Sequence, residues 1–478
     1  MSPAQTGLIV ALYFLVLMVI SFVTGKKNDN KTFFLGNRQS PWYIVSIGMI
    51  GASLSGVTFI SVPGWVGATQ FTYLQMVAGY FLGYLVIAHV LLPVYYKLNL
   101  TSIYTYLEKR FGTWTYKTGA SLFLISRTIG ASARLYLMAN VLQLSLFNAL
   151  GIPFAITVAI TILLIWLYTF RGGIKTIIWT DTLQTIFMLT SVIITIIYMA
   201  KSMNLGFSSL VETINNSELS RIFVFDDWSS KQHFVKQFFT GAFITIVMTG
   251  LDQDMMQKNL SCKNIKDAKK NMVWYGFAFV PTNILFLSLG ALLYIFANHH
   301  GLTLPERSDD LFPMVVNSGL LPAAVGVFFI LGLVAAAYSS ADSALTSLTT
   351  SFSVDILNHN NKEITKRTRI AVHIMFSILL GITIILFRIF KADSIISTIF
   401  DLAGYTYGPL LGLYAFGLFN KLQIKEKWVP LIAILAPVIT WVLAFNSLNW
   451  FGFSLGYEKL MLNGLFTYLG LLVIIRKQ

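Results

Sequence analysis

The sequence predicts an all-α polytopic membrane protein, and three observations support this fold class. Of its 478 residues, 56% are apolar and only 11% are charged, whereas soluble domains carry about 25% charged residues. The apolar residues gather in runs of about 20, the length that an α-helix needs to cross a bilayer. Lys and Arg side chains concentrate in alternate connections between these runs. We therefore expect the lipid bilayer to surround most of the chain.

The apolar runs predict about thirteen transmembrane helices. In chain order they are Gln5–Gly25, Trp42–Trp65, Phe71–Tyr96, Tyr116–Asn148, Pro153–Thr169, Thr176–Ala200, Phe238–Met256, Met272–Ala297, Pro322–Leu357, Thr368–Phe387, Ser394–Phe419, Val429–Phe445 and Lys459–Ile475. Residues 1–25 would form a leading helix, residues 42–200 and 238–419 five helices each, and residues 429–478 two trailing helices with a short tail.

The positions of Lys and Arg orient these helices. With the N-terminus outside, the cytoplasmic connections hold about three times as many Lys and Arg residues as the outer ones, as the positive-inside rule requires. Lys26 and Lys27 follow the first apolar run rather than precede it, so this run is not expected to be a signal peptide. We expect a protein of the inner (plasma) membrane with a cytoplasmic C-terminus. The net charge of +14 then comes mostly from Lys and Arg residues in the cytoplasmic connections, and no nucleic-acid partner is expected.

The two five-helix segments also predict an internal symmetry. Five is an odd number, so the second segment enters the membrane from the side opposite to the first. The expected arrangement is a five-plus-five inverted repeat. Secondary transporters commonly have this arrangement, with their binding site between the repeats near the bilayer midplane.

The second apolar run has an unusual composition for a transmembrane helix. Its segment SIGMIGASLSGVTFISVPGWVG, residues 46–67, combines several Gly and Ser residues with Thr58 and Pro63. Gly and Pro weaken helices, and non-helical backbone at membrane depth occurs where it lines a cavity or is buried in protein. One interpretation is a discontinuous helix whose carbonyls near Gly51 and Leu54 coordinate a cation. The alternative is a tight helix–helix contact through small residues.

The segment AAAYSSADSALTSLTTS, residues 335–351, is rich in hydroxyl groups within an apolar run. Adjacent Ser339 and Ser340 can present two oxygen atoms to a hard cation such as sodium. Asp342 and Asp181 are carboxylates inside predicted helices, where charged groups are costly and usually functional. A cation between these two acids is one interpretation; the alternative is that each acid is protonated, hydrogen-bonded and structural.

These segments resemble the sodium/solute symporter family over roughly residues 33–419. The motifs that carry the resemblance are Ser53-Leu54-Ser55-Gly56, Val62-Pro63-Gly64, Gly172-Gly173, Trp179-Thr180-Asp181 with Gln184, and Ala336 with Ser339-Ser340. The resemblance implies a leucine-transporter-like ten-helix core, and bacterial sialic-acid, galactose and proline symporters are among the members that the chain resembles.

The resemblance further implies a sodium site and a possible second one. The shared site would use the carbonyls of Gly51, Leu54 and Ala336 with the hydroxyls of Ser339 and Ser340. The second sodium site of some members would correspond to four residues of this chain, Asp181, Ser339, Asp342 and Ser343. Asp342 stands where a serine is expected, which leaves open whether sodium or a proton is used there. Sodium is the expected coupling ion, with no organic cofactor.

Candidate solute-binding residues come from two sources. Arg127 and Arg134 lie seven residues apart on one helical face, and an intramembrane arginine requires an anionic partner. By resemblance to anion-carrying members such as sialic-acid symporters, Ser55 and Thr58 would contact the solute, and Ser53, also a candidate, takes the position of an Asp that proline symporters carry nearby. Asp252 corresponds to polar positions near the solute or the inner gate, with a solvated helix end beside Lys258 as the alternative.

The expected function is sodium-coupled import of a small organic solute by alternating access. An organic anion such as sialic acid or a monocarboxylate is favoured over a sugar, polyol or amino acid. A membrane-embedded enzyme is disfavoured, since the sequence lacks HExxH, GxSxG and P-loop motifs. A channel is the other alternative, and it would not accumulate solute against a gradient.

Overall fold

The computed structural model describes residues 3–24, 30–357, 364–388 and 395–476. Within these ranges all regular secondary structure is helical apart from two isolated bridges, Ser40 with Cys262 and Ile424 with Ile475. The predicted all-α fold class is therefore confirmed. Gly25 and Ser394, which bound two of the predicted helices, lie outside the described residues.

The first part of the chain forms α1 (Pro3–Thr24), α2 (Asn30–Leu35), α3 (Trp42–Ser53), α4 (Gly56–Thr69), α5 (Tyr73–Val86), α6 (Leu92–Lys97), α7 (Thr105–Arg110), α8 (Thr113–Leu142), α9 (Phe154–Ser202) and α10 (Phe207–Asn215). The second part forms α11 (Phe234–Thr245), α12 (Gln253–Leu260), α13 (Ile265–His299), α14 (Leu311–Asn317), α15 (Ala323–Ser351), α16 (Lys366–Phe387), α17 (Ile395–Thr406), α18 (Gly408–Phe419), α19 (Val429–Phe451) and α20 (Lys459–Val473). Turns of π-helix lie at η2 (Ile87–Leu91), η3 (Gln143–Phe147), η6 (Ile246–Gly250) and η8 (Phe352–Leu357).

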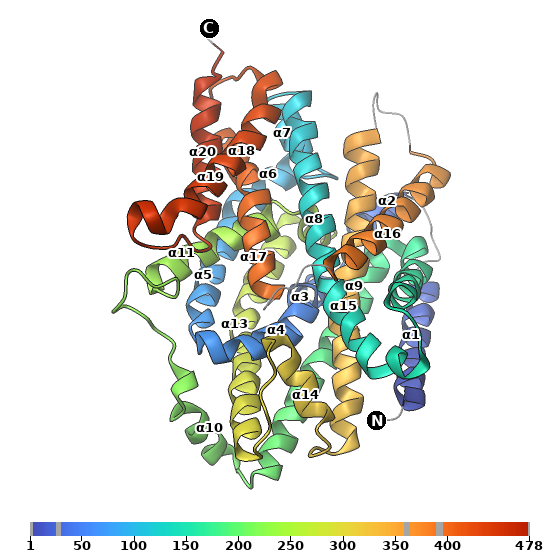
Figure 1. Cartoon of the computed structure of the whole chain (residues 1–478). Helices are drawn as coiled ribbons and strands as arrows, with labels where there is room; N and C mark the ends of the chain where they lie inside the picture. The colour runs from blue at the N-terminus through green and yellow to red at the C-terminus, as the bar shows by residue number, and fades with distance from the viewer. Residues whose placement is uncertain (1–2, 25–29, 358–363, 389–394, 477–478) are drawn as a thin grey trace.

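The helices form a bundle whose centre is occupied by short, interrupted elements. Figure 1 shows α1 at one side of the molecule, α19 and α20 at the other, and α3 and α4 near the middle. α15 packs against α9, α8 and α3. All residues of α15 from Gly332 to Ser351 are buried, so its hydroxyl groups face protein rather than lipid.

Seven helices of the described chain are long and apolar enough to cross a membrane, or up to nine when each of two bent helix pairs counts as one span. Three shorter apolar helices accompany them, Phe154–Thr169, Gly408–Phe419 and Lys459–Val473. Each of the thirteen predicted segments overlaps a helix. The multi-pass membrane architecture is therefore supported, while the count of thirteen and the inverted repeat stay predictions.

The predicted interruption of the second span is confirmed. α3 ends at Ser53, α4 begins at Gly56, and the two helices bend by 55°. Leu54 (φ −80°, ψ 45°) and Ser55 (φ −50°, ψ 178°) leave helical geometry between them. The carbonyls in the last turn of α3 consequently lose their regular helical donors, although the Leu54 N–H still bonds to the Ile50 carbonyl oxygen at 2.8 Å.

The alternative interpretation of the same segment, close packing through small residues, also holds. A Cβ atom on Gly51 would lie 2.0 Å from the Thr185 hydroxyl oxygen of α9. That hydroxyl donates to the Ile47 carbonyl of α3 at 3.0 Å and to the Asp181 carbonyl of α9 at 2.7 Å. Gly51 thus permits a close approach of α3 to α9, and the interrupted helix is fixed on the helix that carries Asp181.

Two further irregularities shape the core. The long helix α9 contains Gly173 at φ 53°, which separates the two spans predicted at 153–169 and 176–200. The pair formed by residues 234–250 and α12 bends by 65°, with Asp252 capping α12 through a bond from the Asp254 N–H at 2.9 Å. A helix interruption at Leu251–Asp252 was not predicted from the sequence.

Candidate functional site

The interrupted helix packs against the hydroxyl-rich helix α15, and one contact between them, the junction, joins Ser340 to the last turn of α3. Ser340 of α15 donates its hydroxyl to the Ala52 carbonyl oxygen of α3 at 3.3 Å and contacts the Ala336 carbonyl oxygen at 3.5 Å. Ala52 lies between Gly51 and Leu54 in the last turn of α3, so the predicted carbonyl segment and the predicted hydroxyl do come together. The Ala52 carbonyl was not among the predicted oxygen atoms.

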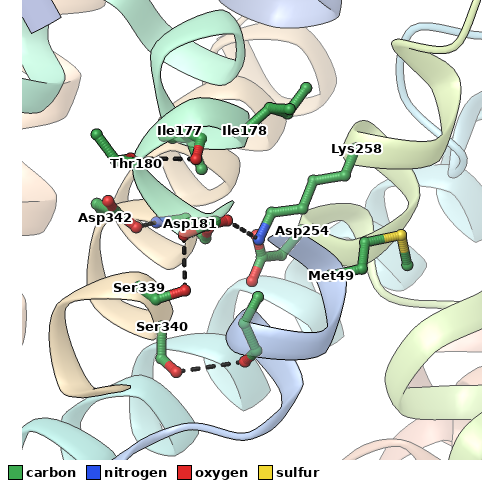
Figure 2. A network of polar contacts seen from close by, with 12 residues as sticks. Met49, Ile177, Ile178, Thr180, Asp181, Asp254, Lys258, Ser339, Ser340 and Asp342 are labelled. Carbon is green, nitrogen blue, oxygen red and sulfur yellow. Dashed lines mark hydrogen bonds and ion pairs between the residues drawn. The ribbon is translucent and has the colours of Figure 1, made fainter. Parts of the chain in front are cut away.

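Beside this junction, Asp181 of α9 forms the centre of a buried polar network (Figure 2). Its Oδ1 accepts a hydrogen bond from the Ser339 hydroxyl at 2.6 Å, and its Oδ2 accepts one from the Ser343 hydroxyl at 3.4 Å. The Lys258 ammonium of α12 lies 2.7 Å from the same Oδ2 atom. The cation that pairs with Asp181 in the structure is therefore the Lys258 ammonium, a side chain of the protein itself.

Asp342 lies next to this network but has its own partners. The Tyr168 hydroxyl donates to its Oδ2 at 2.9 Å, and the Ser343 N–H donates to its Oδ1 at 2.6 Å. Both acids are 0% exposed. Asp181, Asp342, Ser339 and Ser343, predicted together as a second ion site, are therefore brought together by the structure.

The alternative interpretation, a solvated helix end at Asp252 beside Lys258, is wrong. Lys258 is 1% exposed, and Asp252 and Asp254 are equally buried. The physical reason is the interruption at Leu251–Asp252, which turns α12 inward so that its charged residues face α8, α9 and α15. Lys258 follows the predicted end of the span, Met256, by only two residues, and this proximity is the one sequence signal for its burial.

A cavity of about 100 Å³ lies beside the interrupted helix. Five of the six predicted solute-binding residues line it: Ser53, Ser55, Thr58, Arg127 and Arg134. Aromatic side chains supply much of the remaining wall, namely Tyr73, Tyr80, Tyr84, Tyr275, Phe279 and Phe400. Such a lining, mostly apolar with a few convergent polar groups, is typical of a small-molecule site.

Asp252, the sixth predicted solute-binding residue, is not part of the cavity wall. It is fully buried and accepts a hydrogen bond from the Tyr407 hydroxyl at 2.5 Å. Its carboxylate also lies 4.0 Å from the Arg127 guanidinium. Its contacts therefore connect α12 with α8 and with the residue that separates α17 from α18.

The two arginines of α8 differ in their partners. Arg127, 4% exposed, forms an ion pair with Asp254. Arg134 is half-buried and lines the cavity, and no carboxylate in the described part of the chain lies within ion-pairing distance of it. Both guanidinium groups line the cavity, but within the described residues only that of Arg127 is paired with a carboxylate.

A multi-helix fold with two interrupted helices beside a small cavity is typical of a solute transporter. The chain belongs to the sodium:solute symporter family, whose model matches residues 33–423. This match confirms the predicted family and makes the chain a sodium-coupled symporter rather than an enzyme.

Two curated relatives are similar over most of their length. The sodium/sialic acid symporter NanT of Aliivibrio fischeri is 26% identical over 443 residues, which cover 90% of this chain and 86% of NanT. The sodium/sialic acid symporter SiaT of Proteus mirabilis is 24% identical over 426 residues, which cover 85% and 82%.

Solved structures show the fold. A Na+-coupled sialic acid symporter in a substrate-bound outward-open state superposes with a TM-score of 0.82 at 19% identity, covering 99% of both chains. Mhp1, a nucleobase-cation-symport-1 family transporter, superposes with a TM-score of 0.54 at 13% identity, covering 92% of this chain and 93% of Mhp1. At these identities the likeness concerns the architecture and not the solute.

Proposed function

We propose that this symporter imports a small organic anion together with sodium by alternating access, in the plasma membrane with its N-terminus outside. Sialic acid and monocarboxylates are the solute classes that we favour. The observation that carries this proposal is the Arg134 guanidinium in the cavity wall, which has no carboxylate partner among the described residues.

An unpaired cation is costly in a membrane interior and is usually functional. Arg127 has its counter-charge in Asp254, so the cavity offers one guanidinium to an incoming group. A guanidinium is suited to bind a carboxylate through two parallel hydrogen bonds. The hydroxyls of Ser55 and Thr58, also in the wall, would bind hydroxyl or carbonyl groups of the same solute.

The coupling sodium would bind at the junction of α3 and α15. The carbonyls of Gly51, Leu54 and Ala336 and the hydroxyls of Ser339 and Ser340 form the proposed ligand set. Sodium, a hard cation, prefers such oxygen atoms. By joining the interrupted helix to α15, the ion would favour the state that completes the solute site, and a ligand shifts a conformational equilibrium only through such differential affinity.

The relatives support the choice of solute. NanT and SiaT are named as sodium/sialic acid symporters, and a mouse relative 26% identical over 412 residues is sodium-coupled monocarboxylate transporter 1. These solutes share a carboxylate. An anion is therefore the common chemical requirement, and Arg134 meets it.

Uptake into liposomes containing the purified full-length chain tests the proposal. The probes are radiolabelled N-acetylneuraminate, pyruvate, galactose and proline, each with an inward sodium gradient or with potassium or choline in its place. We expect N-acetylneuraminate or pyruvate to accumulate above its external concentration with an inward sodium gradient, and not with potassium or choline in its place. Ser340→Ala should abolish the sodium stimulation, because the junction loses a ligand.

Ser347→Ala is the matched control. Ser347 is a buried serine on the same helix, and its hydroxyl donates to the Ala344 carbonyl at 3.0 Å, away from the junction. It should transport like the unmodified chain. Accumulation of galactose or proline instead of the anions would overturn the proposed solute class, and equal accumulation in potassium or choline would overturn sodium coupling.

A further inference from the structure

α12 carries a buried lysine, Lys258, whose role the proposed sodium coupling does not explain. Lys258 is among the largest fully buried side chains of the described chain, and its ammonium lies 2.7 Å from Asp181 Oδ2. Figure 2 shows it extending from α12 toward Asp181. Removing an ammonium from water costs several kcal/mol even after relaxation. The position must therefore supply a strong compensating interaction, and the Asp181 carboxylate does so.

The oxygen atoms around this ammonium are those of a cation site. Asp181 receives the Ser339 hydroxyl on Oδ1, and receives the ammonium and the Ser343 hydroxyl on Oδ2. These three residues belong to the set predicted to hold a second sodium. The ammonium already provides the positive charge that such a sodium would bring to Asp181.

A mobile cation would compete poorly for the same carboxylate. At an effective dielectric constant of about 20, two unit charges about 4 Å apart repel by roughly 4 kcal/mol. Asp342 accepts hydrogen bonds from the Tyr168 hydroxyl and from the Ser343 N–H, and among the described residues it forms no ion pair with Lys258. A sodium ion at Asp181 would require Lys258 to leave.

We infer that the Lys258 ammonium is a built-in cation that permanently occupies the site formed by Asp181, Ser339 and Ser343, so that the transporter binds one coupling sodium, at the junction, and not two. This inference rests on the proposed sodium coupling. The ion pair joins α12, the segment after the second interruption, to α9. Since Ser339 also belongs to the proposed junction site, the Lys258 ammonium lies directly beside the position proposed for the coupling sodium.

Equilibrium binding of radioactive sodium to the purified full-length chain, without solute, counts the sites. The unmodified chain should bind one sodium ion at saturation. Lys258→Gln should double the saturating amount, because it frees Asp181 for a second ion, and Lys258→Gln with Asp181→Asn should return to one. Lys258→Arg, which keeps the charge, and Lys263→Gln, which changes an exposed lysine of the following connection, should both remain at one.

The outcomes separate this inference from the proposed function. Two sodium ions on the unmodified chain, with one lost in Asp181→Asn, would overturn the inference and leave sodium coupling intact. A folded Lys258→Gln protein that still binds one ion would also overturn it. Absence of sodium binding to the unmodified chain would overturn the coupling itself. If Lys258→Gln does not fold, the number of sodium ions bound by the unmodified chain and by Asp181→Asn still tests the inference. The inference requires one sodium ion in each of these two proteins.

Discussion

Replacement of Arg134 by glutamine should weaken solute binding without unfolding the protein. Arg134 lines the cavity and has no carboxylate partner in the described chain, so its removal leaves no buried acid unpaired. A hydrogen bond to a charged group contributes about 1.5–3 kcal/mol. The KM for N-acetylneuraminate or pyruvate, whichever is transported, should rise by about tenfold to 150-fold, since 1.4 kcal/mol corresponds to a factor of ten.

The same substitution at Arg127 should act on stability instead. Arg127 and Asp254 form a buried ion pair, and Asp252 lies 4.0 Å from the same guanidinium. Removing one member of a buried pair costs about 3–5 kcal/mol, because the remaining charge is left uncompensated. Arg127→Gln should therefore lower thermal stability, and Arg127→Gln with Asp254→Asn should recover much of it.

Two measurements on the same preparations separate these effects. Sodium-driven uptake into liposomes gives KM, and the fraction of protein that remains monodisperse after heating in detergent gives stability. The reasoning is refuted if Arg134→Gln leaves KM unchanged. It is equally refuted if Arg127→Gln raises KM as much as Arg134→Gln does and melts like the unmodified chain, because both arginines would then bind solute directly.

Three further predictions concern the proposed ion sites and the connection between α12 and α13. Asp342→Asn should raise the sodium concentration for half-maximal uptake by about fivefold, since loss of a nearby charge weakens cation binding by on the order of 1 kcal/mol; an unchanged sodium titration would make Asp342 structural. Gly51→Ala should destabilise the protein by about 1–3 kcal/mol, because its Cβ would lie 2.0 Å from the Thr185 hydroxyl, and Thr185→Ala should relieve this loss in a thermal melt. Cys262 is fully buried, and burial raises the pKa of its thiol to about 12. Because the thiolate is the reactive form, maleimide labelling should stay slow up to pH 9, and rapid labelling would show that this connection opens to solvent.

The interruption of the second span could be predicted because its cause is local. Gly, Ser and Pro residues crowd one apolar run, and each weakens a helix through its own backbone chemistry. The structure accordingly ends α3 at Ser53 and starts α4 at Gly56. The hydroxyls of α15 were also predictable as candidates, since polar groups inside a span must face protein.

The second interruption and the partner of Asp181 could not be predicted in the same way. Residues 234–260 contain no comparable cluster of Gly and Pro at the bend, so local propensity does not mark Leu251–Asp252. Lys258 and Asp181 lie 77 positions apart in the chain, and a pairing over that distance depends on tertiary packing. A solvated helix end beside Lys258 was a reasonable alternative because Lys258 follows the predicted end of the span, but the sequence pattern does not show that this lysine is buried.

The different roles of the two arginines of α8 could not be predicted from the sequence. They share one face of one helix, and the rule that an intramembrane arginine needs an anion applies equally to both. What distinguishes them is α12, which directs Asp254 at Arg127 and leaves Arg134 toward the cavity. In a medium that penalises every uncompensated charge, the pairs that are complete within the protein, Arg127 with Asp254 and Lys258 with Asp181, can be assigned to its architecture. Arg134 has no carboxylate partner among the described residues, so an anionic solute in the cavity would neutralise its charge. For this reason we assign the solute carboxylate to Arg134.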